Sequence, residues 1–182
     1  IQRILLLTSF VILDRDGVIN QDSVDYIKSA DEWVALPGSL EAIALLTSSK
    51  IEVYIATNQS GVARGKVTLD ALDSIHKKLR REVERAGGGI VDIKYCPHHP
   101  DEKCWCRKPN PGLLEDIAAT YQLNLKEGCY VGDSLKDLQA AESAGCPSIL
   151  VLTGNGIETQ KLSPLHLPVF SDLLAFAKDI TS

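Results

Sequence analysis

The chain has 182 residues, of which 45% are hydrophobic, and this length and apolar content predict one domain spanning residues 1–182 with a substantial buried core. The net charge of −5 argues against a nucleic-acid partner. No apolar run approaches the ~20 residues of a membrane span, so no membrane partner is expected. The odd number of cysteines, five, favours a reducing compartment, the cytoplasm, over a disulfide scaffold.

The first strand is predicted at Phe10–Leu13, where a short apolar run is typical of a strand buried on both faces. Residues 4–13 superficially resemble the core of a signal peptide. The run passes directly into Asp14 without a small-residue cleavage site, so we reject that interpretation. The chain begins at Ile1 and contains no methionine, so we expect the natural N-terminus to differ.

Two carboxylates and a glycine follow this strand, in the order Asp14-Arg15-Asp16-Gly17. Side chains two apart on an extended segment point the same way, so Asp14 and Asp16 should converge while Arg15 faces elsewhere. Gly17 allows an immediate turn. Two adjacent carboxylates repel unless a proton or cation joins them, so the pair indicates Mg²⁺. The alternative is an ordinary solvated turn, because Asp-x-Asp-Gly is common.

Alternating strands and helices follow along the chain. Further strands are predicted at 51–56, 90–95, 129–132 and 148–152. Helices are predicted at 40–46, 69–83, 113–123, 135–144 and 172–180, with Ser39 and Thr68 as N-caps and Gly145 past a C-terminus. The segment 154–168 is predicted to be loop. This alternation predicts an α/β fold, a parallel sheet with helices on both faces.

Several other residues receive ordinary structural interpretations. The charged side of the second helix, residues 77–85, is expected to be solvated, and His76 and His166 are expected to be exposed. Cys129 and Cys146 border short strands and are interpreted as core thiols. The polar segment 22–32, which precedes Trp33, is interpreted as a flap facing the substrate.

Polar groups end three of the predicted strands: Asp14 and Asp16, then Thr57 and Asn58, then Asp133 with Ser134 and Asp137. In a parallel sheet these ends share one edge, so the groups can meet. Asp133 would supply a third carboxylate for the cation, and Thr57 with the N–H groups after it suits a phosphate oxygen. With Lys108 as the basic residue, this set fits phosphoryl transfer to a carboxylate. No nucleotide P-loop sequence is present.

A second constellation lies in the loop 96–106, where Cys96, His98, Cys104 and Cys106 supply three thiolates and one imidazole. This set suffices for tetrahedral Zn²⁺. His99 is a competing ligand. Free thiols in a flexible loop, or two disulfides, are the alternatives, although Cys104 and Cys106 are too close for easy bridging. Four protein ligands leave no open position, so the zinc would be structural. It would hold Arg107 and Lys108 over the phosphate.

Taken in order, Asp14-Arg15-Asp16-Gly17, Thr57-Asn58-Gln59-Ser60-Gly61, Arg107-Lys108-Pro109 and Gly132-Asp133 resemble the four motifs of haloacid-dehalogenase-type (HAD) phosphatases. The resemblance runs from Phe10 to about Gly156. Within the superfamily it is closest to the D-glycero-D-manno-heptose 1,7-bisphosphate 7-phosphatases, followed by the histidinol-phosphate phosphatases. It implies a HAD-like Rossmannoid sheet without a large cap domain, in which the zinc loop partly covers the site.

The resemblance also implies roles, residue by residue. Asp14 would be the nucleophile and Asp16 the general acid/base, and both would hold Mg²⁺ with Asp133. Thr57 and Lys108 would bind the phosphoryl group. The further candidate substrate contacts are Asp22, Asn58, Gln59, Ser60 and Arg107. His98, rather than His99, has the family's position for the zinc ligand. One departure is Ser134, because some heptose phosphatases carry lysine directly after the aspartate of the fourth motif.

The function implied is Mg²⁺-dependent removal of the 7-phosphate of heptose 1,7-bisphosphate through an aspartyl-phosphate. This step would serve nucleotide-activated heptose synthesis for bacterial lipopolysaccharide. A monomer acting on a small sugar phosphate is expected. The alternatives are a phosphatase for histidinol phosphate or another small sugar phosphate, or a catalytically inactive zinc-binding module. A degenerate site would be expected to have lost Asp14, Asp16, Lys108 or Asp133, and all are present.

Overall fold

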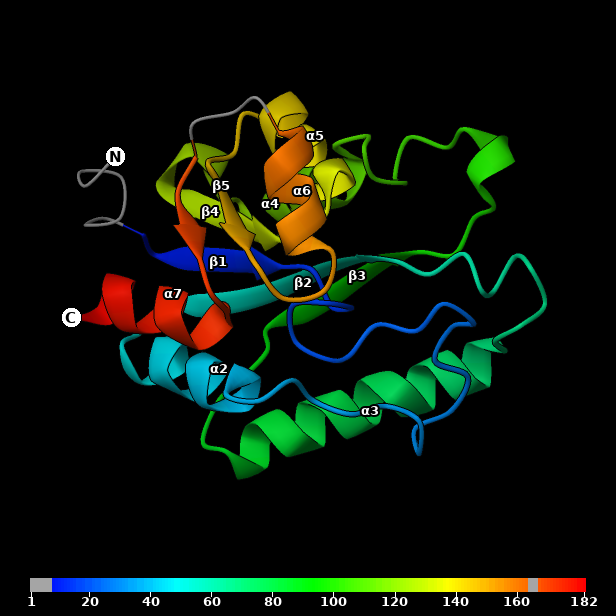
Figure 1. Ribbon diagram of the computed structural model, residues 1–182, viewed down its shortest axis with the longest axis horizontal. Helices are drawn as coiled ribbons and strands as arrows, with labels where there is room; N and C mark the ends of the chain where they lie inside the picture. Colours follow the sequence, from blue (N-terminus) through cyan, green and yellow to red (C-terminus); the bar gives the residue numbers. More distant parts are fainter. Residues whose placement is uncertain (1–7, 164–166) are drawn as a thin grey trace.

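The structure, a computed structural model, describes residues 8–163 and 167–182. Its centre is a six-stranded parallel sheet of order β3-β2-β1-β4-β5-β6 (Figure 1). The strands are β1 (Phe10–Leu13), β2 (Glu52–Asn58), β3 (Asp92–Cys96), β4 (Gly128–Gly132), β5 (Ser148–Val151) and β6 (Val169–Phe170). The predicted α/β class with a parallel sheet is confirmed.

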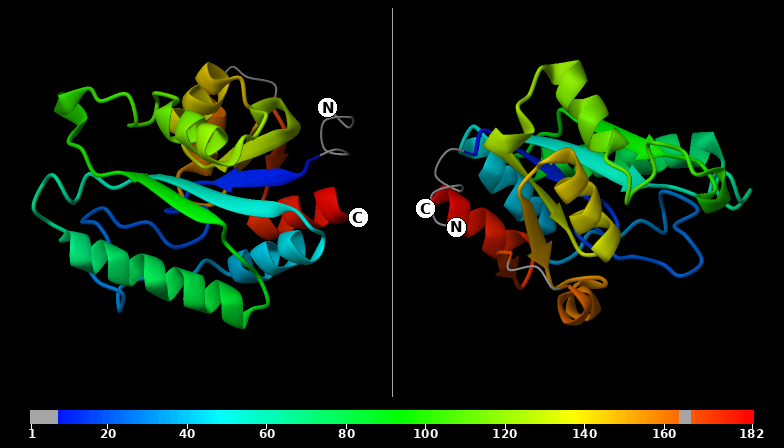
Figure 2. Two further views of the ribbon diagram at one scale, coloured as in Figure 1. Left: turned by 180° about the vertical axis from the view of Figure 1, so that it is seen from behind. Right: turned by 90° about the horizontal axis from the view of Figure 1, so that it is seen from above.

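Helices cover both faces of this sheet, as Figures 1 and 2 show. One face carries α2 (Ser39–Ser48), α3 (Leu69–Arg85) and α7 (Leu173–Thr181). The other carries α4 (Gly112–Tyr121) and α5 (Leu135–Ala144), and α6 (Gly156–Leu162) follows β5. The short 3₁₀ helices are η1 (Pro100–Glu102) and η2 (Leu125–Glu127). The connections 14–38 and 97–111 contain neither an α-helix nor a sheet strand, as expected without a large cap domain.

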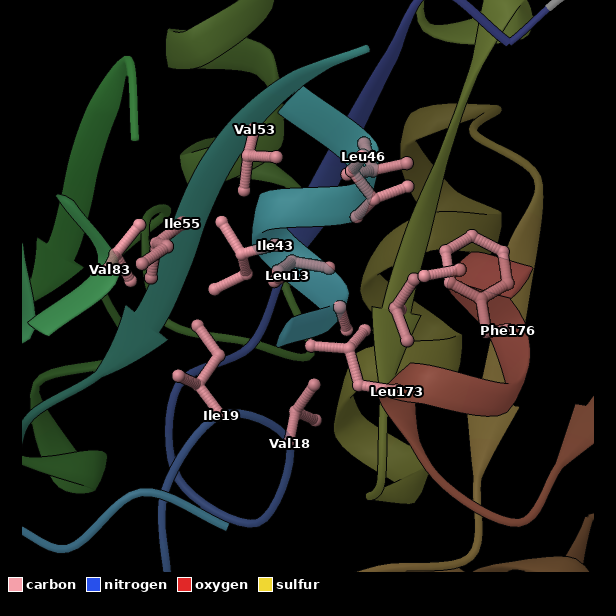
Figure 3. Close-up of a cluster of buried hydrophobic side chains, with 14 of the residues drawn as sticks. Leu13, Val18, Ile19, Ile43, Leu46, Val53, Ile55, Val83, Leu173 and Phe176 are labelled. Atoms are coloured by element: carbon pink, nitrogen blue, oxygen red, sulfur yellow. The ribbon is translucent and has the colours of Figure 1, made fainter. Parts of the chain in front are cut away.

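The core follows from the alternation of side chains along β1, whose four residues are all buried. Leu13 faces α2 and α7 and belongs to the cluster that contains Ile43 and Phe176 (Figure 3). Phe10 and Ile12 belong to the cluster on the opposite face, under α4. Because both faces are covered, β1 could be recognised as a continuous apolar run.

The register of the sheet brings the ends of three strands together. Leu13 pairs with Ile55 of β2 and with Val131 of β4, and the Asp14 amide donates to the Val131 carbonyl oxygen at 2.9 Å. Asp14 therefore leaves the sheet between β2, which carries Thr57, and β4, which Asp133 directly follows. The order of the sheet reverses at β1, and such a reversal is where open α/β sheets bind ligands.

The helix termini agree with the sequence in two of three cases. Thr68 caps α3 by accepting from the Ala71 amide at 3.1 Å, and Gly145 ends α5 with φ of 68°. The prediction of Ser39 as an N-cap is wrong, because Gly38 occupies that position at φ of 77°. The Ser39 hydroxyl instead donates to the Ile19 carbonyl oxygen at 2.6 Å. It ties the segment after β1 to the start of α2.

The predicted loop at 154–168 is also wrong, because α6 and the approach to β6 fall within it. In α6 only Gly156 and Thr159 are buried, while Ile157 is exposed. This short helix therefore has no apolar stripe that periodicity could detect. Strand β6 has two residues, paired with Leu150 and Val151, and is too short to show alternation. The prediction for His166 concerns a residue outside those described.

The charged side of α3 is not uniformly solvated, because it covers the segment after β1. Lys78 donates to the carbonyl oxygens of Ala30 and Trp33 at 2.7 and 2.9 Å and lies over the Trp33 ring. Trp33 is 2% exposed and belongs to the core rather than to a flap. His76 is only partly exposed and contacts Arg15, so the prediction that it is solvent-exposed is wrong. None of the helices described is long and apolar enough to cross a membrane.

Candidate active site

A cavity of about 380 Å³ opens at the carboxyl edge of the sheet, where β1, β2 and β4 end. Among the catalytic, substrate and magnesium residues predicted from the sequence, all but Gln59 line it. They come from four separate segments of the chain, the ends of these three strands and the loop after β3. The sheet register, rather than proximity in sequence, brings them together.

Lys108 is the buried cation of the site. Its Nζ lies 2.8 Å from Asp14 Oδ1 and 2.7 Å from Asp137 Oδ1, and it also donates to the Tyr130 hydroxyl at 2.8 Å. Burial alone would lower the pKa of Lys108, but the carboxylates of Asp137 and Asp14 raise it well above its ordinary value. The side-chain amide of Asn58 pairs with the Lys108 main chain, donating to its carbonyl oxygen and accepting from its N–H, both at 3.1 Å.

Three carboxylates, from Asp14, Asp133 and Asp137, offer oxygens that lie within 4.8 Å of one another. Burial, reinforced by Asp137, raises the pKa of Asp14 well above its usual range and raises that of Asp133 to about 7. The single ammonium of Lys108 does not neutralise the three groups. A cluster of oxygens with surplus negative charge suits a divalent cation.

Asp137 belongs to the polar group that follows the predicted strand 129–132, and the sequence indicates no specific role for it. It lies four residues after Asp133, in the first turn of α5, and is fully buried. Burial would raise the pKa of Asp137, but Lys108 and the hydrogen bonds from Ser134 lower it. The Ser134 hydroxyl donates to Asp137 Oδ2 at 2.7 Å. Ser134 therefore helps to keep ionised the carboxylate that pairs with Lys108.

Asp133 fits into a slot made by two glycines. A Cβ atom on Gly17 or on Gly154 would overlap the Asp133 carboxylate, and both glycines have positive φ, 82° and 55°. The Asn155 amide also donates to Asp133 Oδ2 at 2.7 Å. The loops after β1 and β5 thus fix this carboxylate from two sides.

Asp16 lines the same cavity, but its carboxylate lies outside the cluster of three. It accepts from Arg15 Nε and Nη2 at 2.9–3.0 Å, from Asn20 Nδ2 at 2.8 Å and from Gln59 Nε2 at 2.8 Å. The expectation that Arg15 faces elsewhere is wrong, because this side chain is buried and turns back onto Asp16. Burial would raise the pKa of Asp16, but Arg15 and the two amides lower it.

Gln59 is buried and does not line the cavity, unlike the other residues of its motif that were expected to contact substrate. Its Nε2 donates to Asp16 Oδ2 and, at 3.0 Å, to Thr57 Oγ1. Its Oε1 accepts from Arg15 at 3.1 Å. Gln59 therefore joins Thr57, at the end of β2, to the carboxylate of Asp16.

Cys96, His98, Cys104 and Cys106 form one cluster, with all ligand atoms within 4.8 Å of one another. The Cys96 and Cys106 sulfurs each lie 3.5 Å from Cys104 Sγ, and His98 Nδ1 lies 3.5 Å from Cys96 Sγ and 3.3 Å from Cys106 Sγ. A tetrahedral zinc with Zn–S bonds of about 2.3 Å has S···S edges of about 3.8 Å, so this set fits the ion closely.

His99, Cys129 and Cys146 are not part of this cluster. His99 caps η1 by accepting from the Asp101 amide at 3.3 Å and is not part of the cluster. Burial, followed by its thiol neighbours, raises the pKa of Cys106 far above its ordinary value, as expected where thiolates crowd without a cation. Cys129 and Cys146 are free and buried in the core, as predicted.

Two further cations line the cavity besides Lys108. Arg107 Nη1 is buried and has no hydrogen-bond partner among the described residues. Lys136, in the first turn of α5, is exposed at the cavity and was missed in the sequence, where it appears as an ordinary surface lysine. A buried guanidinium nitrogen without a partner in a cavity indicates an anionic ligand.

Comparisons with known proteins find similarity to phosphatases. A family model described as HAD-hydrolase-like matches residues 105–174. D-glycero-β-D-manno-heptose-1,7-bisphosphate 7-phosphatase of Bordetella bronchiseptica is 52% identical over 172 residues, covering 93% of this chain and 96% of the relative. The enzyme of the same name from Pseudomonas aeruginosa is 49% identical over 170 residues, covering 93% and 96%.

Two solved structures of heptose bisphosphate phosphatases are also similar to this chain. The crystal structure of D,D-heptose 1,7-bisphosphate phosphatase from B. bronchiseptica, complexed with magnesium and phosphate, superposes with a TM-score of 0.92 at 50% identity and covers 95% of this chain and 98% of that one. The corresponding phosphatase from Burkholderia thailandensis has a TM-score of 0.76 at 40% identity, covering 96% and 99%. The chain therefore belongs to the heptose-1,7-bisphosphate 7-phosphatases, a family of HAD-type phosphoric monoester hydrolases.

Proposed function

We propose that this chain hydrolyses the 7-phosphate of D-glycero-β-D-manno-heptose 1,7-bisphosphate, as a cytoplasmic monomer in heptose synthesis for lipopolysaccharide. The observation that carries the proposal is Asp14, a carboxylate 2.8 Å from a buried lysine on the wall of a cavity that also holds unpaired positive charge. The names of the two bacterial relatives support the substrate and the β-anomer.

The proposed reaction proceeds in two steps. Asp14 attacks phosphorus and forms an aspartyl-phosphate, while the bond to the sugar oxygen breaks and Asp16 gives its proton to that oxygen. Asp16, now ionised, takes a proton from water, and the resulting hydroxide cleaves the acyl-phosphate to release phosphate and restore Asp14. Thr57 and Lys108 bind the phosphoryl oxygens. Because its pKa is lowered in the free protein, Asp16 must acquire its proton when the substrate binds.

The carboxylates suit magnesium, which a relative's crystal structure contains. Asp14 and Asp133 would hold the ion. The contribution of Asp16 would come from its main-chain oxygen, because its carboxylate is already bonded to Arg15, Asn20 and Gln59. When bound, Mg²⁺ would supply positive charge that offsets the charge of the phosphoryl group and of the carboxylates. Tetrahedral Zn²⁺ would occupy the cysteine–histidine cluster.

The phosphate that is not cleaved needs its own positive charge, and we assign it to Arg107 and Lys136. Asp22 and Ser60 also line the cavity, and we assign them to hydrogen bonds with the sugar hydroxyls. We expect Lys136→Ala to raise KM for the bisphosphate about fivefold, since one exposed charged contact contributes about 1 kcal/mol, and to leave KM for a sugar 7-monophosphate unchanged. Lys126→Ala, an exposed lysine on η2, is the control. Equal changes on both substrates would contradict the assignment.

The zinc cluster is expected to act through Arg107 more than through Lys108, because Asn58, Tyr130 and Asp137 already hold Lys108. We expect Cys104→Ser to lose zinc, keep its sheet and lower kcat/KM by roughly 10- to 100-fold, as when one charged contact is misplaced. Elemental analysis, far-UV circular dichroism and kinetics on one preparation measure this. His99→Ala is the matched control and should retain zinc. A zinc-free variant with the original rate would refute the link.

A substrate panel tests the proposed function directly. It should contain both anomers of the heptose bisphosphate, the heptose 7-monophosphate and histidinol phosphate, each assayed with Mg²⁺ by phosphate release. We expect the highest kcat/KM for the β-bisphosphate. A preference for histidinol phosphate would overturn the substrate while keeping the chemistry. Absence of hydrolysis of every phosphate ester would favour the inactive zinc-binding module.

A further inference from the structure

We propose that His76, on α3, is a positioning residue for the general acid/base. It accepts a hydrogen bond from Arg15, and Arg15 orients the carboxylate of Asp16. The inference rests on the proposed function, since it concerns the proton that Asp16 gives to the leaving sugar oxygen. His76 is 60 residues beyond Asp16 in the chain and is brought to it only by the packing of α3.

Arg15 links His76 to Asp16. Its side chain is buried, with 1% of the residue's surface exposed, and its guanidinium has partners on three sides. Nε and Nη2 donate hydrogen bonds to the Asp16 carboxylate at 2.9–3.0 Å, and Nη2 also donates to Gln59 Oε1 at 3.1 Å. Nη1 lies 3.3 Å from His76 Nε2, its one hydrogen-bond partner among the described residues. Without His76, a buried charged donor would lose that partner, and this is a costly state.

The hydrogen bond from Arg15 determines the tautomer of His76. An arginine can only donate, so Nε2 must accept, and the ring proton must be on Nδ1. Burial, then the Arg15 guanidinium, lowers the pKa of His76 to about 3, so the ring stays neutral at any pH near neutrality. His76 therefore acts as a constant acceptor and not as a pH sensor.

Among the described residues, His76 supplies the acceptor for Arg15 Nη1. From β3, the Tyr95 ring lies 5.6 Å from the His76 ring, centroid to centroid. The charges that act on His76 come from Arg15, Asp16, Arg80 and Asp73. Besides Arg15, the groups that act on Asp16 are Asn20 and Gln59, and Asp22 interacts with it through charge. Of these, only His76 contacts the far nitrogen of Arg15.

The network extends from α3 to the phosphoryl-binding residue. His76 accepts a hydrogen bond from Arg15. Arg15 and Gln59 both donate to the Asp16 carboxylate, and Gln59 also donates to Thr57. If Arg15 shifts, Asp16 loses its orientation relative to the group that binds the phosphoryl oxygens. The first consequence is poorer delivery of a proton to the leaving oxygen, which matters for a sugar alkoxide and not for a nitrophenolate.

The test compares two substrates on His76→Phe, which keeps a ring against Tyr95 but removes the acceptor, and on His76→Gln, which restores an acceptor oxygen. With His76→Phe we expect kcat/KM to fall about tenfold for the heptose bisphosphate and less than about twofold for 4-nitrophenyl phosphate. With His76→Gln we expect both values within about twofold of the original protein. Lys77→Ala, exposed on the same helix, should change neither.

The ratio of the two rates is measured on a single preparation, so it does not depend on how much protein is folded. Should His76→Phe fail to fold, His76→Leu provides the same comparison. An equal fall on both substrates, no fall, or a His76→Gln variant that behaves like His76→Phe would overturn the proposal. If Asp16→Asn discriminates between the substrates and His76→Phe does not, only this inference fails. If Asp16→Asn itself does not discriminate, the proposed acid role fails, and this inference fails with it.

Discussion

Asp14→Asn is expected to reduce turnover of the heptose bisphosphate by on the order of 10⁵-fold or more, because an amide cannot serve as the nucleophile and removal of such a group costs most of the rate. The fold should survive the change. Lys108 would keep its partners Asp137 and Tyr130, and the substitution removes one charge from a cluster where burial and Asp137 already disfavour ionisation of Asp14.

The measurement is phosphate release, with thermal unfolding and calorimetric titration of inorganic phosphate on the same protein. Asp25→Asn, on an exposed aspartate of the loop after β1, is the matched control and should keep full activity. More than about a hundredth of the original rate in Asp14→Asn would show that another group attacks phosphorus.

Asp16→Asn is expected to lower kcat/KM for the heptose bisphosphate by roughly 10²- to 10³-fold, the usual contribution of a positioned general acid. For 4-nitrophenyl phosphate the loss should be much smaller, because its leaving group departs without a proton. The water-activating role of Asp16 in the second step should still slow kcat for both substrates. Steady-state kinetics over a range of leaving groups measures the difference. A loss independent of the leaving group would indicate that Asp16 acts mainly on the metal or on local structure.

Much of the fold could be predicted because its signals are local. Residues 10–13 form an unbroken apolar run, α5 begins and ends at the predicted residues, and Thr68 has the side chain of an N-cap. Helix α6 could not be predicted because it buries only a glycine and a threonine. Ser39 has the expected cap chemistry, but its hydroxyl donates to a carbonyl across a loop, a tertiary contact that no local pattern shows.

The site was predictable where residue type alone decides the chemistry. Carboxylates, a lysine and a cysteine–histidine set follow the strands, and the structure brings them to one cavity and one cluster. The contacts of Arg15, His76 and Asn58 could not be predicted, because each depends on which neighbour the side chain meets. For Lys108, the structure adds a second support beside the predicted zinc loop, since Asn58 bonds to both the N–H and the carbonyl oxygen of Lys108.

The slot that Gly17 and Gly154 make for Asp133 has a consequence for how this sequence can change over time. Neither position can accept even alanine without displacing a carboxylate of the active site, whereas alanine at Gly89 would meet only ordinary van der Waals contact. Two residues that take no part in chemistry are therefore constrained by the position of the Asp133 carboxylate. A mutagenesis library built on this scaffold should hold both fixed, and the loops they occupy can exchange only with loops that preserve the two glycines.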